Sequence, residues 1–157
     1  MNSNIVMTIQ AILAPALGIS ATGLLLLSLF NRYSSMVNRI RLLNAEKRKY
    51  LDIVLEKDEL PYTENIRLMS IVNQIQNLLF RSKLSRNAIL SIQTAITLFV
   101  LTSVLIGINV FLTSTFAETF ALMLFLTGMI FVLVGIIFSA WEIQNSYKIT
   151  ELEVKVE

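Results

Sequence analysis

A few polar side chains stand inside or beside long apolar runs of this 157-residue chain, where they could do chemistry. Gln10, Ser28 and Asn109 carry amide or hydroxyl groups, and Glu142 carries a carboxylate directly after an apolar run. An amide without a hydrogen bond is costly in hydrocarbon, so such groups bond to protein or contact water. They indicate either hydrogen bonds between helices or the lining of an ion path. Gln10 and Asn109 could instead contact lipid headgroups.

Small residues share helical faces with these polar groups. On the first predicted helix, six small or polar residues lie within about 80° of one another around the helix axis, at 100° per residue. On the third predicted helix, three small residues and one acid recur every seven residues, which keeps them near one face of the helix. We expect close helix packing there; the alternative is a pore lining or gate that leaves room for water. The two stripes are Gln10, Ala14, Gly18, Ala21, Ser28 and Arg32, and Ala121, Gly128, Gly135 and Glu142.

Two further positions are candidates for a role in packing or ion passage. Pro15 removes a backbone donor and should free the carbonyl of Ala11, which bends the helix or exposes a carbonyl to an ion. Glu142 is expected to pair with Arg32 or another nearby base. The alternatives for Glu142 are solvation and a cation-attracting ring at a pore mouth.

The composition excludes most enzyme chemistry. The chain has no Cys and no His, which removes disulfides, thiolates, imidazole bases and the usual zinc or haem ligands. It has no phosphate-binding glycine loop or kinase signature. The acidic pairs Asp58-Glu59 and Glu151/Glu153 lie in an expected turn and tail without supporting ligands. We predict no enzyme, no catalytic residue, no cofactor and no metal site.

Three apolar stretches must position the polar groups, at residues 1–31, 87–117 and 119–141. Each exceeds the roughly 20 residues that an α-helix needs to cross a bilayer core. The sequence therefore predicts an all-α integral membrane protein with transmembrane helices at residues 1–31, 88–113 and 119–141. Residues 32–87 form the large loop, and residues 142–157 form a C-terminal tail, expected as a continued helix that frays.

The basic residues give the expected orientation. Of 13 Lys and Arg, eleven lie between residues 31 and 88, and the other two are Lys148 and Lys155. Cytoplasmic loops carry the excess of Lys and Arg, so we predict a plasma or inner membrane with the N-terminus outside and the C-terminus cytoplasmic. Arg32, Tyr33 and Trp141 are the expected anchors at the inner interface. No nucleic-acid motif accompanies the bases, so the expected partner is the lipid bilayer and not nucleic acid.

The loop is predicted to be an antiparallel, coiled-coil-like helical hairpin. Apolar residues recur at three-and-four spacing on both arms, and Pro61 marks the turn. Thr63 is the expected N-cap of the second arm. Two thin arms bury little surface, so we expect self-association or a cytosolic partner. The apolar stripes are Tyr33, Met36, Val37, Ile40, Leu43, Tyr50, Leu51 and Val54, and Leu68, Ile71, Val72, Ile75, Leu78 and Leu79.

Several short motifs recur along the chain in a recognisable order. They are Ala14-Pro15-Ala16, Ser20-Ala21-Thr22-Gly23-Leu24, Asn31-Arg32-Tyr33, Arg39-Ile40-Arg41, the basic residues 81–86, and Trp141-Glu142-Ile143. Together they resemble the bacterial domain-of-unknown-function family 2721. The resemblance covers nearly the whole chain and implies a three-span integral membrane protein. It brings no catalytic residues.

Two hypotheses follow from these patterns. The first is a homo-oligomeric passive ion channel, because three helices cannot enclose an aqueous pore by themselves. The second is a membrane scaffold or adaptor that transports nothing and whose hairpin binds a cytosolic partner or anionic lipid.

Overall fold

Three long helices make up this computed structural model, which describes residues 2–57, 62–112 and 114–155. They are α1 (Asn2–Lys57), α2 (Tyr62–Leu112) and α3 (Thr115–Lys155), with 56, 51 and 41 residues. At 1.5 Å per residue their lengths are about 84, 77 and 62 Å, at least twice the roughly 30 Å of a bilayer core. All three are long and apolar enough to cross a membrane. The predicted all-α fold with three membrane-spanning helices is confirmed at this level.

The helices do not break where the apolar stretches end. α1 runs on past residue 31, and α2 joins the loop to the second apolar stretch without interruption, as expected. The helices begin earlier than expected at two places. α2 already begins at Tyr62, so Thr63 lies inside the helix and is not its N-cap. α3 begins at Thr115, four residues before the expected start at residue 119, because Ser114 accepts the first helical hydrogen bond from the Glu118 amide at 3.3 Å.

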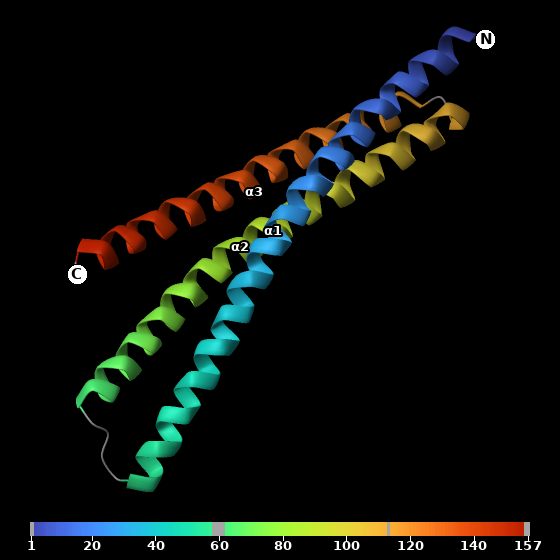
Figure 1. The fold of residues 1–157 in the computed structure, drawn as a ribbon. Helices are drawn as coiled ribbons and strands as arrows, with labels where there is room; N and C mark the ends of the chain where they lie inside the picture. Colours follow the sequence, from blue (N-terminus) through green and yellow to red (C-terminus); the bar gives the residue numbers. More distant parts are fainter. Residues whose placement is uncertain (1, 58–61, 113, 156–157) are drawn as a thin grey trace.

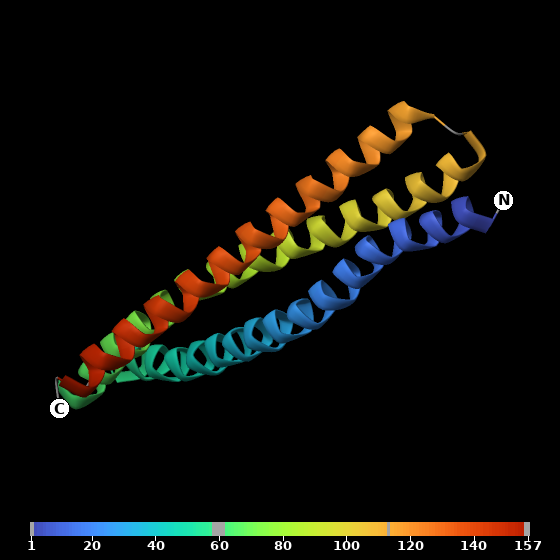
Figure 2. The same ribbon diagram turned by 90° about the horizontal axis from the view of Figure 1, so that it is seen from above.

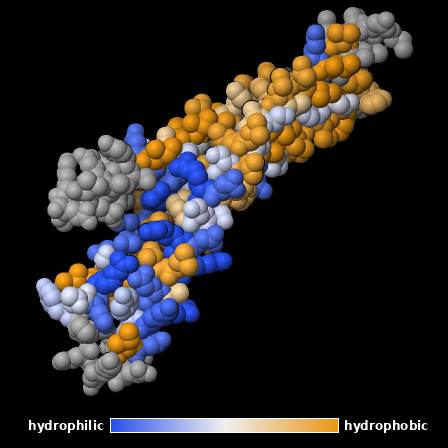
Figure 3. All heavy atoms as spheres, viewed as in Figure 1, coloured by the Kyte–Doolittle hydropathy of each residue, from blue (hydrophilic) through white to orange (hydrophobic). Residues whose placement is uncertain are grey.

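α2 is the central helix. It packs against both α1 and α3, whereas α1 and α3 scarcely contact each other. The N-terminus lies at the same end as the α2–α3 connection, and the α1–α2 hairpin extends beyond the three-helix part at the other end (Figure 1). The C-terminal end of α3 points the same way as the hairpin but diverges from it (Figures 1 and 2). Apolar side chains cover the three-helix part, and polar side chains cover most of the hairpin (Figure 3).

The packed face of α1 follows a seven-residue spacing. The buried positions are Pro15, Thr22, Leu29, Met36 and Leu43. A seven-residue step turns a helix by only about 20° short of two full turns, so these residues remain on the side that faces α2. Leu29 belongs to the core of the three-helix part, and Leu43 belongs to the core of the hairpin. One face of α1 therefore serves both parts of the molecule.

The hairpin is held by a small apolar core and one ion pair. Leu43 packs with Ile71 and Ile75, and Arg67 contacts Glu46 at 3.0 Å across the two arms. The predicted apolar stripes were too wide, because two helices in contact bury only a narrow seam. Leu51 and Leu79, which belong to these stripes, are 42% and 44% exposed. Val54 of the first stripe lies outside the described side chains.

Hydroxyl groups in the apolar parts of the helices bond to their own backbone. The donors Thr94, Thr97, Thr102, Ser103 and Thr127 each reach the carbonyl four residues earlier at 2.8–3.0 Å. These bonds satisfy the hydroxyl group without water or a partner chain. Thr94, Thr97, Thr102 and Ser103 of α2 therefore give no independent support to an ion path.

Candidate functional site

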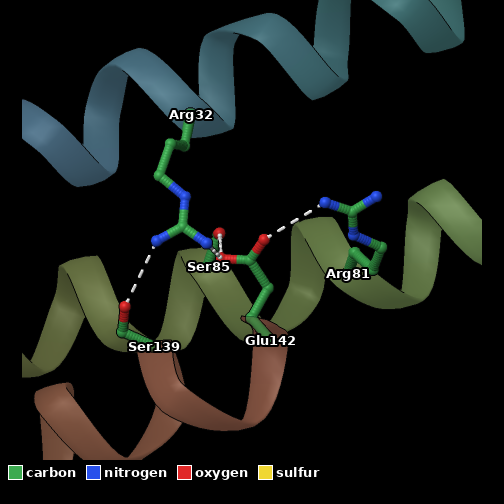
Figure 4. A network of polar contacts seen from close by, with 5 residues as sticks. All are labelled: Arg32, Arg81, Ser85, Ser139 and Glu142. Carbon is green, nitrogen blue, oxygen red and sulfur yellow. Dashed lines mark hydrogen bonds and ion pairs between the residues drawn. The ribbon is translucent and has the colours of Figure 1, made fainter. Parts of the chain in front are cut away.

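The carboxylate of Glu142 joins all three helices at one point. Its side chain is fully buried. Oε2 accepts hydrogen bonds from Arg32 Nη2 on α1 at 2.9 Å and from Ser85 Oγ on α2 at 2.8 Å. Oε1 lies 3.5 Å from Nη2 of Arg81, also on α2 (Figure 4). The predicted pairing of Glu142 with Arg32 is confirmed.

The seven-residue repeat of α3 places Glu142 in this position. The buried residues of that helix are Ala121, Gly128, Gly135 and Glu142. The carboxylate therefore continues a face that the glycines bring close to α2. Ser139, one turn before Glu142, accepts a hydrogen bond from Arg32 Nη1 at 3.4 Å (Figure 4). Arg32 thus holds α1 to α3 at a level where these helices have few other contacts.

The junction carries more positive than negative charge. Two guanidinium groups share one carboxylate, and Arg32 and Arg81 have side chains that are 35% and 27% exposed. Within the described residues, the buried atoms Arg81 Nε and Glu142 Oε1 have no hydrogen-bond partner. The same residues contain no group of acids able to hold a metal ion. The arrangement aligns three helices, and its excess of positive charge can attract an anion.

A second junction is built around Phe99 of α2, whose side chain is fully buried. A Cβ atom on Gly18 of α1 would lie 3.1 Å from the Phe99 ring, and a Cβ atom on Gly128 of α3 would lie 2.7 Å from it. The ring of Phe125 on α3 packs beside Phe99 at a centroid distance of 5.4 Å. Glycine is therefore the residue that lets both outer helices approach this ring.

The faces of α2 and α3 match step by step. Gly128 lies against Phe99, Gly135 against Ile92, and Glu142 against Ser85. Each step of seven residues along α3 corresponds to a step of seven residues back along α2. The small stripe of α3, predicted for packing or for a pore lining, is therefore covered by α2 within one chain.

The predicted stripe of α1 divides into two groups. Gly18 and Arg32 contact the other helices, whereas Gln10, Ala14, Ala21 and Ser28 are exposed. Ala14, Ala21 and Ser28 each come directly before a buried residue of α1, so they lie about 100° around the helix from the packed face. Arg32 shares their side of α1 and reaches α3. The exposed stripe therefore borders the side of α1 next to α3.

Pro15 and the expected anchors take different positions. α1 continues through Pro15 as a helix, and the proline ring is buried. Tyr33 packs, half-buried, against the apolar core of the three-helix part. Trp141 is 57% exposed beside the buried Glu142. The exposed indole has the amphipathic character of an interfacial anchor.

Asn109 caps the connection between α2 and α3. Its Oδ1 accepts the backbone N–H of Ser114 at 2.9 Å, and its Nδ2 donates to Glu118 Oε1 at 3.3 Å. These bonds satisfy the amide at the turn, and Glu118 lies in the first turn of α3, where the helix dipole favours an acid. The side chain of Asn109 is therefore engaged within the chain.

Replacing Asn109 with Ala should destabilise this turn by about 1 kcal/mol, because the Ser114 N–H loses its acceptor. The measurement is amide hydrogen exchange in detergent, where Ser114 and its neighbours should exchange faster while the α1–α2 hairpin is unchanged. The matched control is Asn38→Ala on the exposed side of α1. Equal exchange at Ser114 in Asn109→Ala and the wild type would contradict the capping role.

Sequence reasoning missed Phe99, Ile92, Ser85 and Ser139, and it named Arg81 only as one of the basic residues. A signal for the first two was available. Ile92 and Phe99 are seven residues apart, as are Gly128 and Gly135, so large residues on one helix match small residues on the next. Ser139 precedes Glu142 by three residues and shares its face. The sequence contains no comparable signal for Ser85, which lies 57 residues from its partner.

Comparison with known proteins identifies a family. The model of the family described as "Protein of unknown function (DUF2721)" matches residues 12–152, in agreement with the predicted resemblance. No curated protein and no solved structure matches the chain. The matched segment includes the whole junction around Glu142.

Proposed function

We propose that this chain, which belongs to the DUF2721 family of proteins of unknown function, is one subunit of a homo-oligomeric passive ion channel. In this proposal α1 faces the central axis, the N-terminus lies outside, and the hairpin and the C-terminus lie in the cytoplasm of a plasma or inner membrane. The distribution of Lys and Arg supports the orientation.

The observation that carries the proposal is the exposed stripe of Gln10, Ala14, Ala21 and Ser28 along α1. Within the described residues, Gln10 and Ser28 make no side-chain hydrogen bond. A polar group at membrane depth is stable where it faces protein or water, and it is costly against lipid. Copies of α1 around an axis provide such an environment for the whole stripe, with small residues that leave space for water.

The fold also supports an oligomer. One chain places its outer helices on a central helix, so a ring of subunits is required to enclose a pore. The hairpin extends well beyond the apolar part of the molecule (Figure 3), where neighbouring hairpins can contact one another. Cyclic symmetry would then place identical stripes around one axis.

The alternative is a scaffold or adaptor that conducts nothing. One feature favours it specifically: large apolar side chains are exposed on the polar hairpin. Leu42, Met69 and Tyr62 are 73%, 69% and 81% exposed. Exposed apolar side chains outside a bilayer can contact another protein where they form a continuous patch. The same exposed side chains would equally suit contact between the hairpins of two copies of this chain.

Single-cysteine variants test the channel directly, because the chain contains no native Cys. In liposomes with an ion-flux readout, a charged, water-soluble thiol reagent should modify Ala21→Cys and Ser28→Cys and remove most of the flux. The matched controls are Ser20→Cys and Leu27→Cys, which are exposed one position away on a different side of α1. These controls should face lipid, resist the reagent and keep their flux.

Three outcomes decide between the hypotheses. A ring-shaped oligomer with flux that is blocked only at positions 21 and 28 supports the channel. A monomer without flux would exclude it. An oligomer without flux, whose cysteines at positions 21 and 28 form disulfides between subunits but resist the reagent, indicates dry packing and favours the scaffold.

A further inference from the structure

We infer that the junction of Arg32, Arg81 and Glu142 binds the phosphate group of an anionic phospholipid. The inference does not require ion conduction, and it concerns the end of the α1 side on which the exposed stripe lies, because Arg32 shares that side. It begins with the charge, since two guanidinium groups surround one fully buried carboxylate. One positive charge remains for a ligand to neutralise.

The unused donors are available at the same place. Arg32 makes two hydrogen bonds, to Glu142 and Ser139, and Arg81 makes one contact with Glu142 at 3.5 Å. A guanidinium group has five N–H donors, so most of the ten are free of these contacts. The buried Nε of Arg81 lacks a partner within the described residues. Phosphate oxygens are acceptors that suit the planar donor geometry of arginine.

The position along the molecule selects a lipid as the source of the phosphate. Arg32 and Glu142 directly follow the apolar stretches 1–31 and 119–141, so the junction lies at the end of the apolar part, the level at which lipid phosphates stand beside a membrane helix. Trp141, next to Glu142, is 57% exposed there. Both arginine side chains are partly exposed, at 35% and 27%, so a headgroup can approach them from the side. Basic sites between membrane helices are known to take anionic headgroups.

The test compares lipid retention in nanodiscs made of phosphatidylcholine alone or mixed with phosphatidylglycerol. The wild type should retain phosphatidylglycerol selectively by native mass spectrometry and should melt at a higher temperature in the mixed nanodiscs. Arg81→Gln should weaken this retention about fivefold, the change expected for one interfacial base. The matched control is Arg67→Gln, which removes the same charge from the hairpin and should retain the lipid as the wild type does.

A second variant changes the charge in the opposite direction, and its lipid retention is measured per folded molecule because the substitution also lowers stability. Glu142→Gln leaves both guanidinium groups and removes their shared counter-charge, so retention of phosphatidylglycerol should increase, whereas a loss of structure would decrease it. Equal retention of both lipids by the wild type would overturn the inference without any variant. Inorganic phosphate alone should not raise the melting temperature in phosphatidylcholine nanodiscs. A rise equal to that with phosphatidylglycerol would assign the site to a free anion and overturn the lipid assignment.

Discussion

Glu142→Gln is expected to lower the free energy of unfolding by about 3 kcal/mol, because two arginine side chains lose their common carboxylate in a buried position. The carboxylate is fully buried, whereas Arg32 and Arg81 are 35% and 27% exposed. The partial exposure of the arginines places the effect at the lower end of the range for broken buried pairs. Denaturant unfolding in a neutral detergent measures the change.

The control for this prediction is Glu46→Gln in the hairpin. Glu46 pairs with Arg67 at 3.0 Å, but both side chains are substantially exposed, at 35% and 51%. An exposed pair contributes about 0–1 kcal/mol, so this variant should unfold close to the wild type. If both variants lost the same stability, burial would not be the reason that the Glu142 junction matters.

Gly128→Leu is expected to destabilise the three-helix part by about 3 kcal/mol, the upper part of the usual range for overpacking. Even a Cβ atom at this position would lie 2.7 Å from the Phe99 ring. The ring cannot move away freely, because Gly18 confines it on the side of α1 and Phe125 packs beside it. The effect should be visible as a lower melting temperature in detergent and as a loss of contact between α2 and α3.

Gly23→Leu is the matched control, since a Cβ atom at Gly23 has no neighbour within 4 Å. It replaces glycine by leucine within another of the long helices and should be neutral or slightly stabilising, because leucine is the better helix former. A pair of substitutions tests the mechanism further: Phe99→Leu should relieve the milder Gly128→Ala variant. If the double variant lost as much stability as the sum of the two single variants, the Phe99 ring would not be the group that clashes at position 128.

The fold was predictable from local patterns, because each apolar run exceeds the length of a membrane-spanning helix and no helix breaker separates the first run from the hairpin arm. The face of α3 was predictable for the same reason. Gly128, Gly135 and Glu142 repeat at a spacing that needs no knowledge of the partner helix. The pairing of Glu142 with Arg32 followed from electrostatics, since a carboxylate beside an apolar run requires a base.

Which residues of α2 contact the small residues of α3 depends on the register between the two helices. The periodicity of a single helix does not specify that register. Phe99 is one of several large residues on α2, and only the antiparallel alignment of α2 with α3 selects it for the space at Gly128. The same limitation affected α1, where one predicted stripe contains both the contacting Gly18 and the exposed Ala21. A small residue marks a position where close helix contact is possible. The location of the neighbouring helix decides which small residues make that contact.

The bond between Arg32 and Glu142 has a consequence for the order in which the protein matures. The two residues are 110 positions apart, and Glu142 comes near the end of the chain. Synthesis proceeds from the N-terminus, so both arginines of the junction exist before their carboxylate does. A chain that stops before Glu142 has two positive groups, on α1 and α2, without their shared counter-charge. Completion of the third helix is therefore the step that neutralises the first two and closes α1 onto α3.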